Sequence, residues 1–254
     1  MIFFVGAGPG APDLITVRGQ RLLQTADLIL YAGSLVNPEL LSYAKKTCTI
    51  FNSASMTLEE VVAAMLHAER EGKQTVRLHT GDPSIYGAIR EQMDALDRYG
   101  ISYEVVPGVS SFCGAAAALR AEYTLPGVSQ TVILTRMAGR TPVPETEEIA
   151  ALAAHQATMV IFLSTGMLPA LTQRLLAGGY SPDTPAALVY KATWEDEKTV
   201  RCTVQRLAQA AQEHAITKTA LVLIGHFLGN DYERSCLYHP AFSHEFRDAS
   251  EGKV

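Results

Sequence analysis

The first residues that could do chemistry form a glycine-rich segment directly after an apolar run. Residues 6–11 (GAGPGA) match the G-x-G-x-x-G/A pattern, in which N–H groups at the start of a helix bind a pyrophosphate. A nicotinamide-dependent dehydrogenase is therefore the first hypothesis. Against it, Pro9 and Pro12 lack an N–H group, and a helical pattern resumes only around residues 16–25. The second apolar run is followed by residues 31–34 (YAGS) instead of the acidic residue that binds a ribose hydroxyl.

Two further loops combine glycine with hydroxyl-bearing residues. In residues 79–87 (HTGDPSIYG), Gly81 lets backbone groups approach a ligand without interference from a Cβ atom. Carbonyl groups in such a loop suit an ammonium group, whereas an aspartate such as Asp82 is more often structural. Ser110 and Ser111 open a helical pattern and offer hydroxyl and N–H groups that suit a carboxylate. For Ser110, a plain helix cap is an equally good interpretation.

Composition and charge exclude several classes of protein. Of 254 residues, 48% are hydrophobic and 19% are charged, which is typical of a globular chain with one large or two ordinary domains. A net charge of −5 argues against a general nucleic-acid binder. The four cysteines and seven histidines lack metal-binding spacing, so we expect reduced thiols and no metal site. The chain shows neither a signal peptide nor the ~18-residue apolar run of a membrane helix. We therefore expect a soluble, cytoplasmic protein that does not contact a membrane.

Short apolar runs alternate with helical patterns along the chain, which predicts α/β architecture with largely parallel sheets. We expect strands at residues 2–5, 28–31, 75–78, 103–106, 131–135, 158–163, 186–190, 199–202 and 221–225. We expect helices at residues 57–71, 88–99, 168–177 and 204–214. The first of these begins with a capping box formed by Thr57 and Glu60.

Pro126 and Gly127 interrupt this alternation and predict a linker near residues 118–130. The chain then comprises two consecutive α/β domains, at residues 1–118 and 130–228. Residues 229–254 show no periodicity and form a peripheral tail of unassigned role.

Several segments together resemble the tetrapyrrole methylase family. Residues 6–19 (GAGPGAPDLITVRG) are similar to its first signature. Residues 79–87 are similar to its second signature, the strand-to-helix loop that cradles S-adenosylmethionine, and residues 107–111 (PGVSS) to the loop after the next strand. Four further segments are similar to a subgroup of this family that methylates carbon 11 in corrin biosynthesis. They are residues 31–36 (YAGSLV), 130–136 (QTVILTR), 139–144 (GRTPVP) and 190–195 (YKATWE). The resemblance covers about residues 1–228.

This resemblance implies the tetrapyrrole methylase fold, with a cofactor cleft between two α/β domains, and a homodimer. It implies an S-adenosylmethionine-dependent C-methyltransferase acting on carbon 11 of precorrin-4 or cobalt-precorrin-4. The implied cofactor-binding residues of the first domain are Pro9, Thr80, Gly81, Asp82, Ile85, Tyr86, Ser110 and Ser111. Those of the second domain are Leu163, Tyr190, Lys191, Ala192, Ala220 and Leu221. For Leu163 and Leu221, ordinary core packing is a strong alternative.

A precorrin carries many carboxylates, so its binding surface should present cations. Arg136 and Arg140 lie in a proline-rich loop after a strand, where α/β folds place ligands. Arginine binds carboxylates with two parallel hydrogen bonds. His79 is a further substrate-binding candidate, and Lys191, Arg18 and Arg77 have less support. We assign no catalytic base, because the methylated ring carbon becomes quaternary and need not lose a proton. Any cobalt would be held by the macrocycle.

Four alternatives remain. Another tetrapyrrole methylase could act on a different ring carbon or on uroporphyrinogen, although the arginine loop at residues 136–144 argues against this. Relatives of the fold modify ribosomal RNA or diphthamide, but the acidic chain disfavours RNA. The nicotinamide-dependent dehydrogenase is the third. A non-enzymatic binding module is the least favoured, because three loops of small residues follow strand ends.

Overall fold

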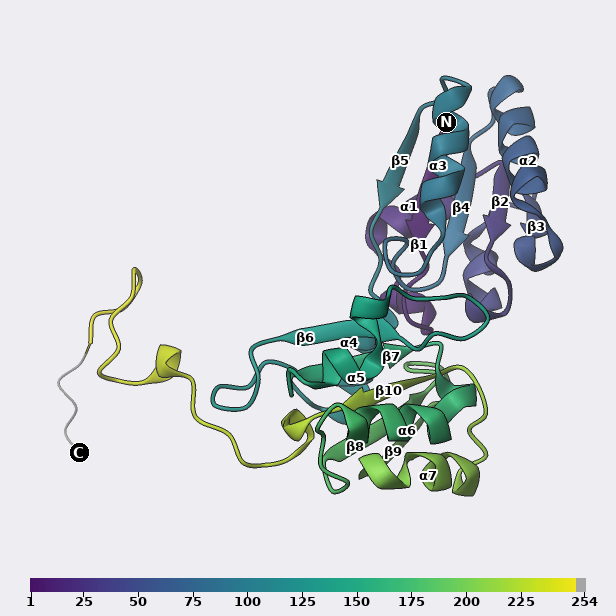
Figure 1. Ribbon diagram of the computed structural model, residues 1–254. Coiled ribbons are helices and arrows are strands. Elements are labelled where there is room, and N and C mark those ends of the chain that lie inside the picture. Colours follow the sequence, from purple (N-terminus) through teal and green to yellow (C-terminus); the bar gives the residue numbers. More distant parts are fainter. Residues whose placement is uncertain (250–254) are drawn as a thin grey trace. The chain divides into compact units, whose positions relative to one another are not determined.

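The computed structural model describes residues 1–249 and contains two five-stranded sheets (Figure 1). The first sheet has the strand order β3-β2-β4-β1-β5. Its strands are β1 (Ile2–Gly6), β2 (Leu28–Tyr31), β3 (Thr49–Asn52), β4 (Thr75–His79) and β5 (Tyr103–Val106). All neighbouring strands pair in parallel, with Phe4 of β1 opposite Arg77 of β4 and Val105 of β5. The carboxyl ends of these strands therefore lie along one edge of the sheet.

Four α-helices accompany the first sheet, namely α1 (Val17–Thr25), α2 (Leu58–Arg70), α3 (Ile89–Arg98) and α4 (Ser111–Leu119). Of these, α1 packs on one face of the first sheet and α2 and α3 pack on the other. Alternation along β1 sends Val5 into a core cluster with Leu23 of α1, and Phe4 into a second cluster with Met65 of α2 and Leu96 of α3. The capping box expected at Thr57 and Glu60 is present at the start of α2.

The second sheet has the strand order β6-β7-β10-β8-β9. Its strands are β6 (Val132–Arg136), β7 (Thr158–Phe162), β8 (Pro185–Tyr190), β9 (Lys198–Thr203) and β10 (Ala220–Ile224), and α5 (Ile149–Ala153), α6 (Leu168–Ala177) and α7 (Leu207–Glu213) accompany them. β6 pairs with β7 in parallel, but β10 pairs with β7 antiparallel. The second sheet is therefore mixed, so the expectation of largely parallel pairing is fully met only in the first sheet.

The strands expected from the sequence all form, each within one residue of its expected limits at either end. The helix expected at residues 204–214 begins with a 3-10 turn at Val204–Arg206 and continues as α7. Among the strands and α-helices, three were not expected: β3, α5, and the body of α4 beyond its opening serines.

The described chain divides into two compact units. The first consists of Met1–Leu119, Val189–Thr199 and Thr219–Leu221, and the second of the remaining described residues. The sequence-based limits placed residues 189–199 and 219–221 in the second domain. Both segments belong to the first unit: Thr193 and Trp194 form hydrogen bonds with Ala11 and Pro9 of the glycine-rich segment, and the N–H of Lys191 donates to the carbonyl oxygen of Thr219. Within the described chain, every helix is too short or too polar to cross a membrane.

Candidate functional site

Four glycines meet at the carboxyl edge of the first sheet, where β1, β4 and β5 end. Gly8 and Gly81 exchange backbone hydrogen bonds of 2.9 and 3.3 Å. A Cβ atom on Gly6 would lie 2.5 Å from the Cα of Gly108, and one on Gly108 would lie 2.2 Å from the carbonyl oxygen of Gly81. Both distances are shorter than any real contact of a Cβ atom. Only glycine therefore allows the three loops to pack together.

The carboxylate of Asp82 ties two of these loops together. Its Oδ2 accepts a hydrogen bond of 2.8 Å from the N–H of Gly108, and its Oδ1 accepts bonds from the N–H and hydroxyl of Ser84. Burial acts to raise the pKa of Asp82, but the hydrogen bonds from Ser84 and Gly108 outweigh it and hold the pKa below its ordinary value. These contacts support a structural role for Asp82.

The loop between β4 and α3, residues 80–88, has an unusual backbone. Gly81, Tyr86 and Ala88 have φ angles of +61°, +56° and +48°, in the left-handed region that non-glycine residues rarely adopt. The side chain of Tyr86 is 47% exposed, whereas Thr80 and Ile85 are half-buried. Strained backbone of this kind persists where surrounding contacts hold it, and it is common in ligand-binding loops.

Behind this loop, β4 carries a buried polar network. Arg77 is 6% exposed, and its Nε donates to Oε1 of Gln92 at 3.0 Å while a terminal nitrogen donates to the carbonyl of Leu30 at 3.1 Å. Gln92 in turn donates to the carbonyl of Ala88 at 3.1 Å. Burial lowers the pKa of Arg77 to about 10, so the guanidinium stays charged at neutral pH. The network joins the strand before the loop to the helix after it.

His79 is only 2% exposed, and its Nε2 has no hydrogen-bond partner among the described residues. Burial and the nearby charge of Arg77 lower the pKa of His79 to about 3, so the imidazole is neutral. A neutral, buried ring does not support the substrate-binding role that the sequence suggested for this side chain.

The loop after β5 leads directly into α4. Ser110 is 7% exposed, and its carbonyl oxygen accepts the N–H groups of Cys113 and Gly114 at 3.0 and 3.4 Å. A Cβ atom on Gly81 would lie 3.4 Å from the Cα of Ser110, so this loop packs against the loop after β4. Ser111, the first residue of α4, is half-buried.

Residues 190–197 bring further predicted cofactor residues to the same unit. A Cβ atom on Gly114 would lie 3.0 Å from Pro9 Cβ and 3.4 Å from Ala192 Cβ, so Pro9 and Ala192 both contact α4. Trp194 donates to the carbonyl of Pro9 at 3.2 Å. Lys191 pairs with Asp196 at 2.7 Å. The first unit thus brings together Pro9, Gly81, Ser110 and Ala192, whose segments are far apart in the sequence.

The remaining cofactor-binding candidates that the resemblance implies for the second domain differ in burial. Ala220 and Leu221 begin β10, and both are 7% exposed. Leu163 follows β7 and is 64% exposed, with a φ of +53°. Core packing is therefore wrong as an interpretation of Leu163, because its strand has already ended at Phe162.

In the second unit, Arg136 organises the loop that follows β6. Its guanidinium donates to the carbonyl oxygens of Met137, Thr141 and Pro142 at 3.2, 3.2 and 2.7 Å. The hydroxyl of Ser164, which follows β7, accepts the N–H of Met137 at 2.9 Å. Arg140 lies within this loop and is exposed. Arg136 thus shapes the loop, and Arg140 is the more accessible cation.

Two contributors were missed by sequence reasoning. Ser164 could have been found from its place after a strand end, the signal that pointed to Ser110 and Ser111. Trp194 lies in a segment that the family resemblance had singled out, but its contact with Pro9 spans 185 residues. The local sequence gives no signal from which a contact between residues so far apart in the chain could be predicted.

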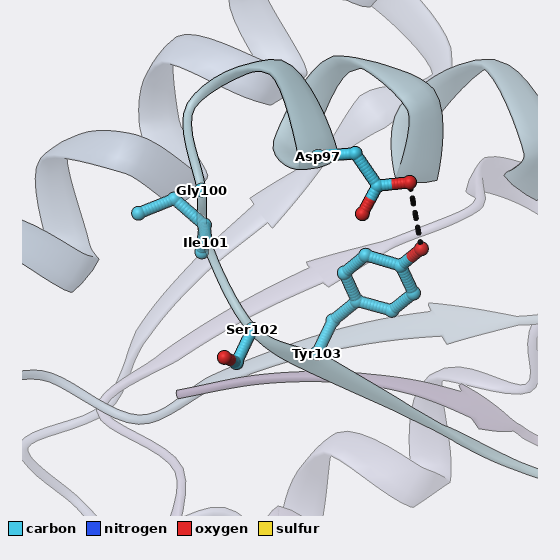
Figure 2. Close-up of a pocket in the computed structure, with 5 residues that line it drawn as sticks. All are labelled: Asp97, Gly100, Ile101, Ser102 and Tyr103. Carbon is cyan, nitrogen blue, oxygen red and sulfur yellow. Dashed lines mark hydrogen bonds between the residues drawn. The ribbon is translucent and has the colours of Figure 1, made fainter.

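A hollow elsewhere on the first unit is lined by Asp97, Gly100, Ile101, Ser102 and Tyr103 (Figure 2). In it, the Tyr103 hydroxyl donates to Asp97 at 3.2 Å. Tyr103 is the first residue of β5, so the hollow lies at the amino edge of the sheet, opposite the glycine loops. It is therefore separate from the candidate site. Within residues 1–249, no cluster of three or more His, Cys, Asp or Glu side chains could hold a metal ion.

Comparisons with known proteins agree with this picture. The model of a family described as Tetrapyrrole (Corrin/Porphyrin) Methylases matches residues 1–208. A cobalt-precorrin-4 C(11)-methyltransferase from Methanocaldococcus jannaschii is 53% identical over 247 residues, which is 97% of this chain and 95% of the relative. The X-ray structure of CbiF, a cobalt precorrin-4 methyltransferase of cobalamin biosynthesis, superposes with a TM-score of 0.88 and 51% identity, covering 90% of this chain and 96% of the other. A uroporphyrin-III C-methyl transferase from Thermus thermophilus, complexed with S-adenosyl homocysteine, has a TM-score of 0.72 and 25% identity, covering 89% and 92%. The match of the family model over residues 1–208 and the identity to these relatives show that the chain belongs to the tetrapyrrole (corrin/porphyrin) methylase family.

Proposed function

We propose that this chain is an S-adenosylmethionine-dependent C-methyltransferase of cobalamin biosynthesis. Its reaction is methylation of carbon 11 of cobalt-precorrin-4 or of precorrin-4. The observation that carries this proposal is the 53% identity, over nearly the full length of both chains, to a relative named for that reaction. The similarity to CbiF, with a TM-score of 0.88, supports it at the level of the fold.

The first unit offers the backbone that a methyl donor needs. Gly6, Gly81 and Gly108 bring three loops together, and the loop at residues 80–88 holds an exposed Tyr86 in a left-handed conformation. The complex of a structural neighbour with S-adenosyl homocysteine supports this choice of cofactor. We assign the cofactor to the surface formed by Pro9, the loop at residues 80–86, the serines at 110–111 and Ala192. The residues that remain candidates for binding the adenine of the cofactor are Leu163, Tyr190, Lys191, Ala220 and Leu221.

Bound S-adenosylmethionine supplies an electrophilic methyl group, and the electron pair of the broken C–S bond stays on sulfur, so the leaving group is neutral. The attacked ring carbon becomes quaternary and keeps no proton to be removed. The protein residues therefore need to orient two ligands more than to move protons. Orientation alone can supply roughly 7–11 kcal/mol of a reaction barrier in favourable cases. We accordingly assign no general base.

The loop after β6 is the proposed contact for the substrate carboxylates. Arg136 uses its guanidinium to hold three carbonyl groups of this loop, which leaves the exposed Arg140 best able to reach a ligand. A guanidinium binds a carboxylate through two parallel hydrogen bonds. We therefore propose Arg140 as the direct contact and Arg136 as the residue that shapes the loop around it.

The proposal is tested by incubating the protein with methyl-labelled S-adenosylmethionine and with precorrin-4, cobalt-precorrin-4 or uroporphyrinogen III. NMR of the product should place the label on carbon 11 of one of the first two substrates. A label at another position, or on uroporphyrinogen alone, would assign the chain to a different tetrapyrrole methylase. Binding of a nicotinamide cofactor in calorimetry, with no binding of S-adenosylhomocysteine, would revive the dehydrogenase hypothesis.

We also propose that the protein is a homodimer, on the strength of the family resemblance. Light scattering should give about twice the chain mass of 27.4 kDa. A mass equal to that of one chain would contradict the dimer and leave the enzymatic proposal untouched.

A further inference from the structure

Within the first unit, residues 193 and 194 hold the glycine-rich segment at residues 8–11 by two hydrogen bonds. Nε1 of Trp194 donates to the carbonyl oxygen of Pro9 at 3.2 Å. Oγ1 of Thr193 accepts the N–H of Ala11 at 3.0 Å. The partners are 185 and 182 residues apart in the sequence, so neither contact follows from local chain geometry.

Gly10, between these two contacts, is fixed from both sides. A Cβ atom on Gly10 would lie 2.2 Å from Cδ1 and 2.5 Å from Nε1 of Trp194, so the indole packs directly on the glycine backbone. The side chain of Asn37 donates to the carbonyl oxygen of Gly10 at 3.0 Å. Three consecutive residues of the glycine-rich segment therefore each have a backbone group held by a side chain from elsewhere.

The segment that contains Trp194, residues 191–197, is held in place by contacts among its own residues. Lys191 and Thr193 have φ angles of +45° and +70°, and such a value is a genuine outlier for a β-branched residue such as Thr193. Glu197 accepts the N–H of Thr193 at 2.6 Å, and Lys191 pairs with Asp196 at 2.7 Å. The ammonium of Lys191 also lies 5.1 Å from the centroid of the Trp194 ring, within cation–π range. Strain maintained by this many contacts is typical of functional segments.

We propose that Trp194 is a positioning residue for methyl transfer: it fixes the Pro9–Gly10 peptide so that the glycine-rich segment keeps the shape that holds S-adenosylmethionine. This inference rests on the proposed function. Trp194 acts through Pro9, whose ring contacts α4 at Gly114, in the first turn of the helix that starts at Ser111. A shift of Pro9 would therefore disturb the surface assigned to the cofactor without removing any of its direct contacts.

The first test replaces Trp194 by phenylalanine, which keeps an aromatic ring and removes the N–H donor. Because one neutral hydrogen bond is lost, we expect the KM for S-adenosylmethionine and the Kd for S-adenosylhomocysteine to rise about fivefold. Tyr99→Phe is the matched control, because it removes one polar group from an exposed aromatic residue at the carboxyl end of α3. It should leave both constants unchanged. A lower melting temperature and Vmax with both constants unchanged would show a purely structural role and overturn the proposal.

Thr193 provides a second pair of variants. Thr193→Val keeps the branched shape and removes the oxygen that accepts the N–H of Ala11, whereas Thr193→Ser keeps the hydroxyl. The valine variant should bind S-adenosylhomocysteine severalfold more weakly, and the serine variant should bind it like the wild type. Equal binding by both variants would show that the held peptide does not matter for the cofactor.

A third test needs no substitution, because Trp194 is the single tryptophan of the chain. Titration with S-adenosylhomocysteine should change the tryptophan fluorescence, with the same Kd that calorimetry measures. Unchanged fluorescence while calorimetry detects binding would overturn the role of Trp194 and leave the proposed function intact. No binding in calorimetry to the wild type would overturn the proposed function itself.

Discussion

Asp82 connects the loop after β4 to the loop after β5 through its carboxylate. One oxygen accepts from Gly108 in the loop after β5, and the other accepts from Ser84 in the same loop as Asp82, so the carboxylate makes one hydrogen bond between the two loops and a second within the loop after β4. Such bonds to an ionised acceptor are stronger than neutral ones. The shape of the candidate site therefore depends on a side chain that need not touch the cofactor.

Asp82→Asn tests this connection. An asparagine offers one acceptor oxygen, so its NH₂ group must face one of the N–H donors of Gly108 or Ser84. We expect the free energy of unfolding at pH 7 to fall by about 1.5–3 kcal/mol, measured by urea denaturation. The exposed Asp231→Asn is the control and should have little effect. An unchanged midpoint for Asp82→Asn would show that the carboxylate is dispensable.

The same variant predicts a pH dependence. The hydrogen bonds lower the pKa of Asp82 in the folded state below its ordinary value of 3.8. Its stabilising contribution is therefore complete above that ordinary value and is lost as the pH falls through the lower folded-state pKa. The stability difference between wild type and Asp82→Asn should be constant near neutral pH and narrow only below about pH 4. A difference that narrows near pH 6 would point to another group.

The two arginines of the second unit should respond differently to truncation. Arg140→Ala should raise the KM for the tetrapyrrole about tenfold, because a charged contact is lost, without changing the melting temperature. Arg136→Ala should raise the same KM and also lower the melting temperature, because three loop carbonyls lose their donor. Neither should change the Kd for S-adenosylhomocysteine. An equal loss of cofactor affinity would remove the assigned substrate role.

Among the elements, β4 and α3 are linked by a buried network in which no carboxylate of the described residues takes part. The Arg77 guanidinium donates to the side-chain oxygen of Gln92 and to the carbonyl of Leu30. The side-chain nitrogen of Gln92 donates in turn to the carbonyl of Ala88, at the end of the loop at residues 80–88. A buried charge without a counter-ion is a poor way to gain stability. We infer instead that the network serves to connect β4 and α3, which lie at the two ends of the loop that contains three residues in the left-handed conformation.

Gln92→Glu separates stability from loop position. The glutamate still accepts from Arg77, now with a charge, but it cannot donate to the carbonyl of Ala88. We expect an equal or higher melting temperature together with a severalfold weaker Kd for S-adenosylhomocysteine. Gln92→Leu, which loses both bonds and leaves the buried charge of Arg77 without this acceptor, should lower the melting temperature and raise the Kd for S-adenosylhomocysteine. Wild-type cofactor binding by Gln92→Glu would show that Ala88 needs no such anchor.

Gly108→Ala tests the junction of the three strand ends. Its new Cβ would meet the backbone of Gly81 and Gly6, which cannot rotate away as a side chain can. Overpacking of this kind should cost about 3 kcal/mol of unfolding free energy, measured by urea denaturation. Gly166→Ala is the control, because nothing lies within 4 Å of a Cβ at that position. Similar losses for both variants would argue against the junction.

Buried strands were well predicted where they are nearly continuous in apolar residues, as in β7, which is buried along its whole length. β3 was missed because all its residues are exposed at the edge of the sheet, which leaves no pattern to detect. The helix α5 has only five residues, too few for a helical period to repeat. The antiparallel pairing of β10 with β7 could not be predicted either, because the periodicity of a strand does not say which strand pairs with it or in which direction.

Within the candidate site, the sequence located the loops better than it located the roles of their residues. Gly81 and Ser110 could be expected where strands end, because parallel strands place their carboxyl ends together. The burial of His79 could not be expected, since a histidine at a strand end looks the same whether it faces solvent or the core. The engagement of Arg136 with its own loop was equally hidden, because a guanidinium bonds carbonyl groups as well as carboxylates.

At the scale of the whole molecule, a ligand that binds only the folded state must stabilise it. S-adenosylhomocysteine at a hundred times its Kd should add about 2.7 kcal/mol to the free energy of unfolding and raise the melting temperature. NAD at the same concentration should leave the melting temperature unchanged. A rise with NAD alone would contradict the assignment of the glycine-rich segment to a methyl donor.

The order of strands in the first sheet has a consequence for a growing chain on the ribosome. β1 is synthesised first, yet it lies between β4 and β5, so it cannot pair with either neighbouring strand until that strand has been synthesised. Gly6, Gly81 and Gly108 cannot meet until residue 108 has emerged, and Trp194 reaches Pro9 later still. A nascent chain therefore has no complete surface for the methyl donor during most of its synthesis. Cellular supply of that donor can protect finished molecules from degradation, but it cannot guide their early folding.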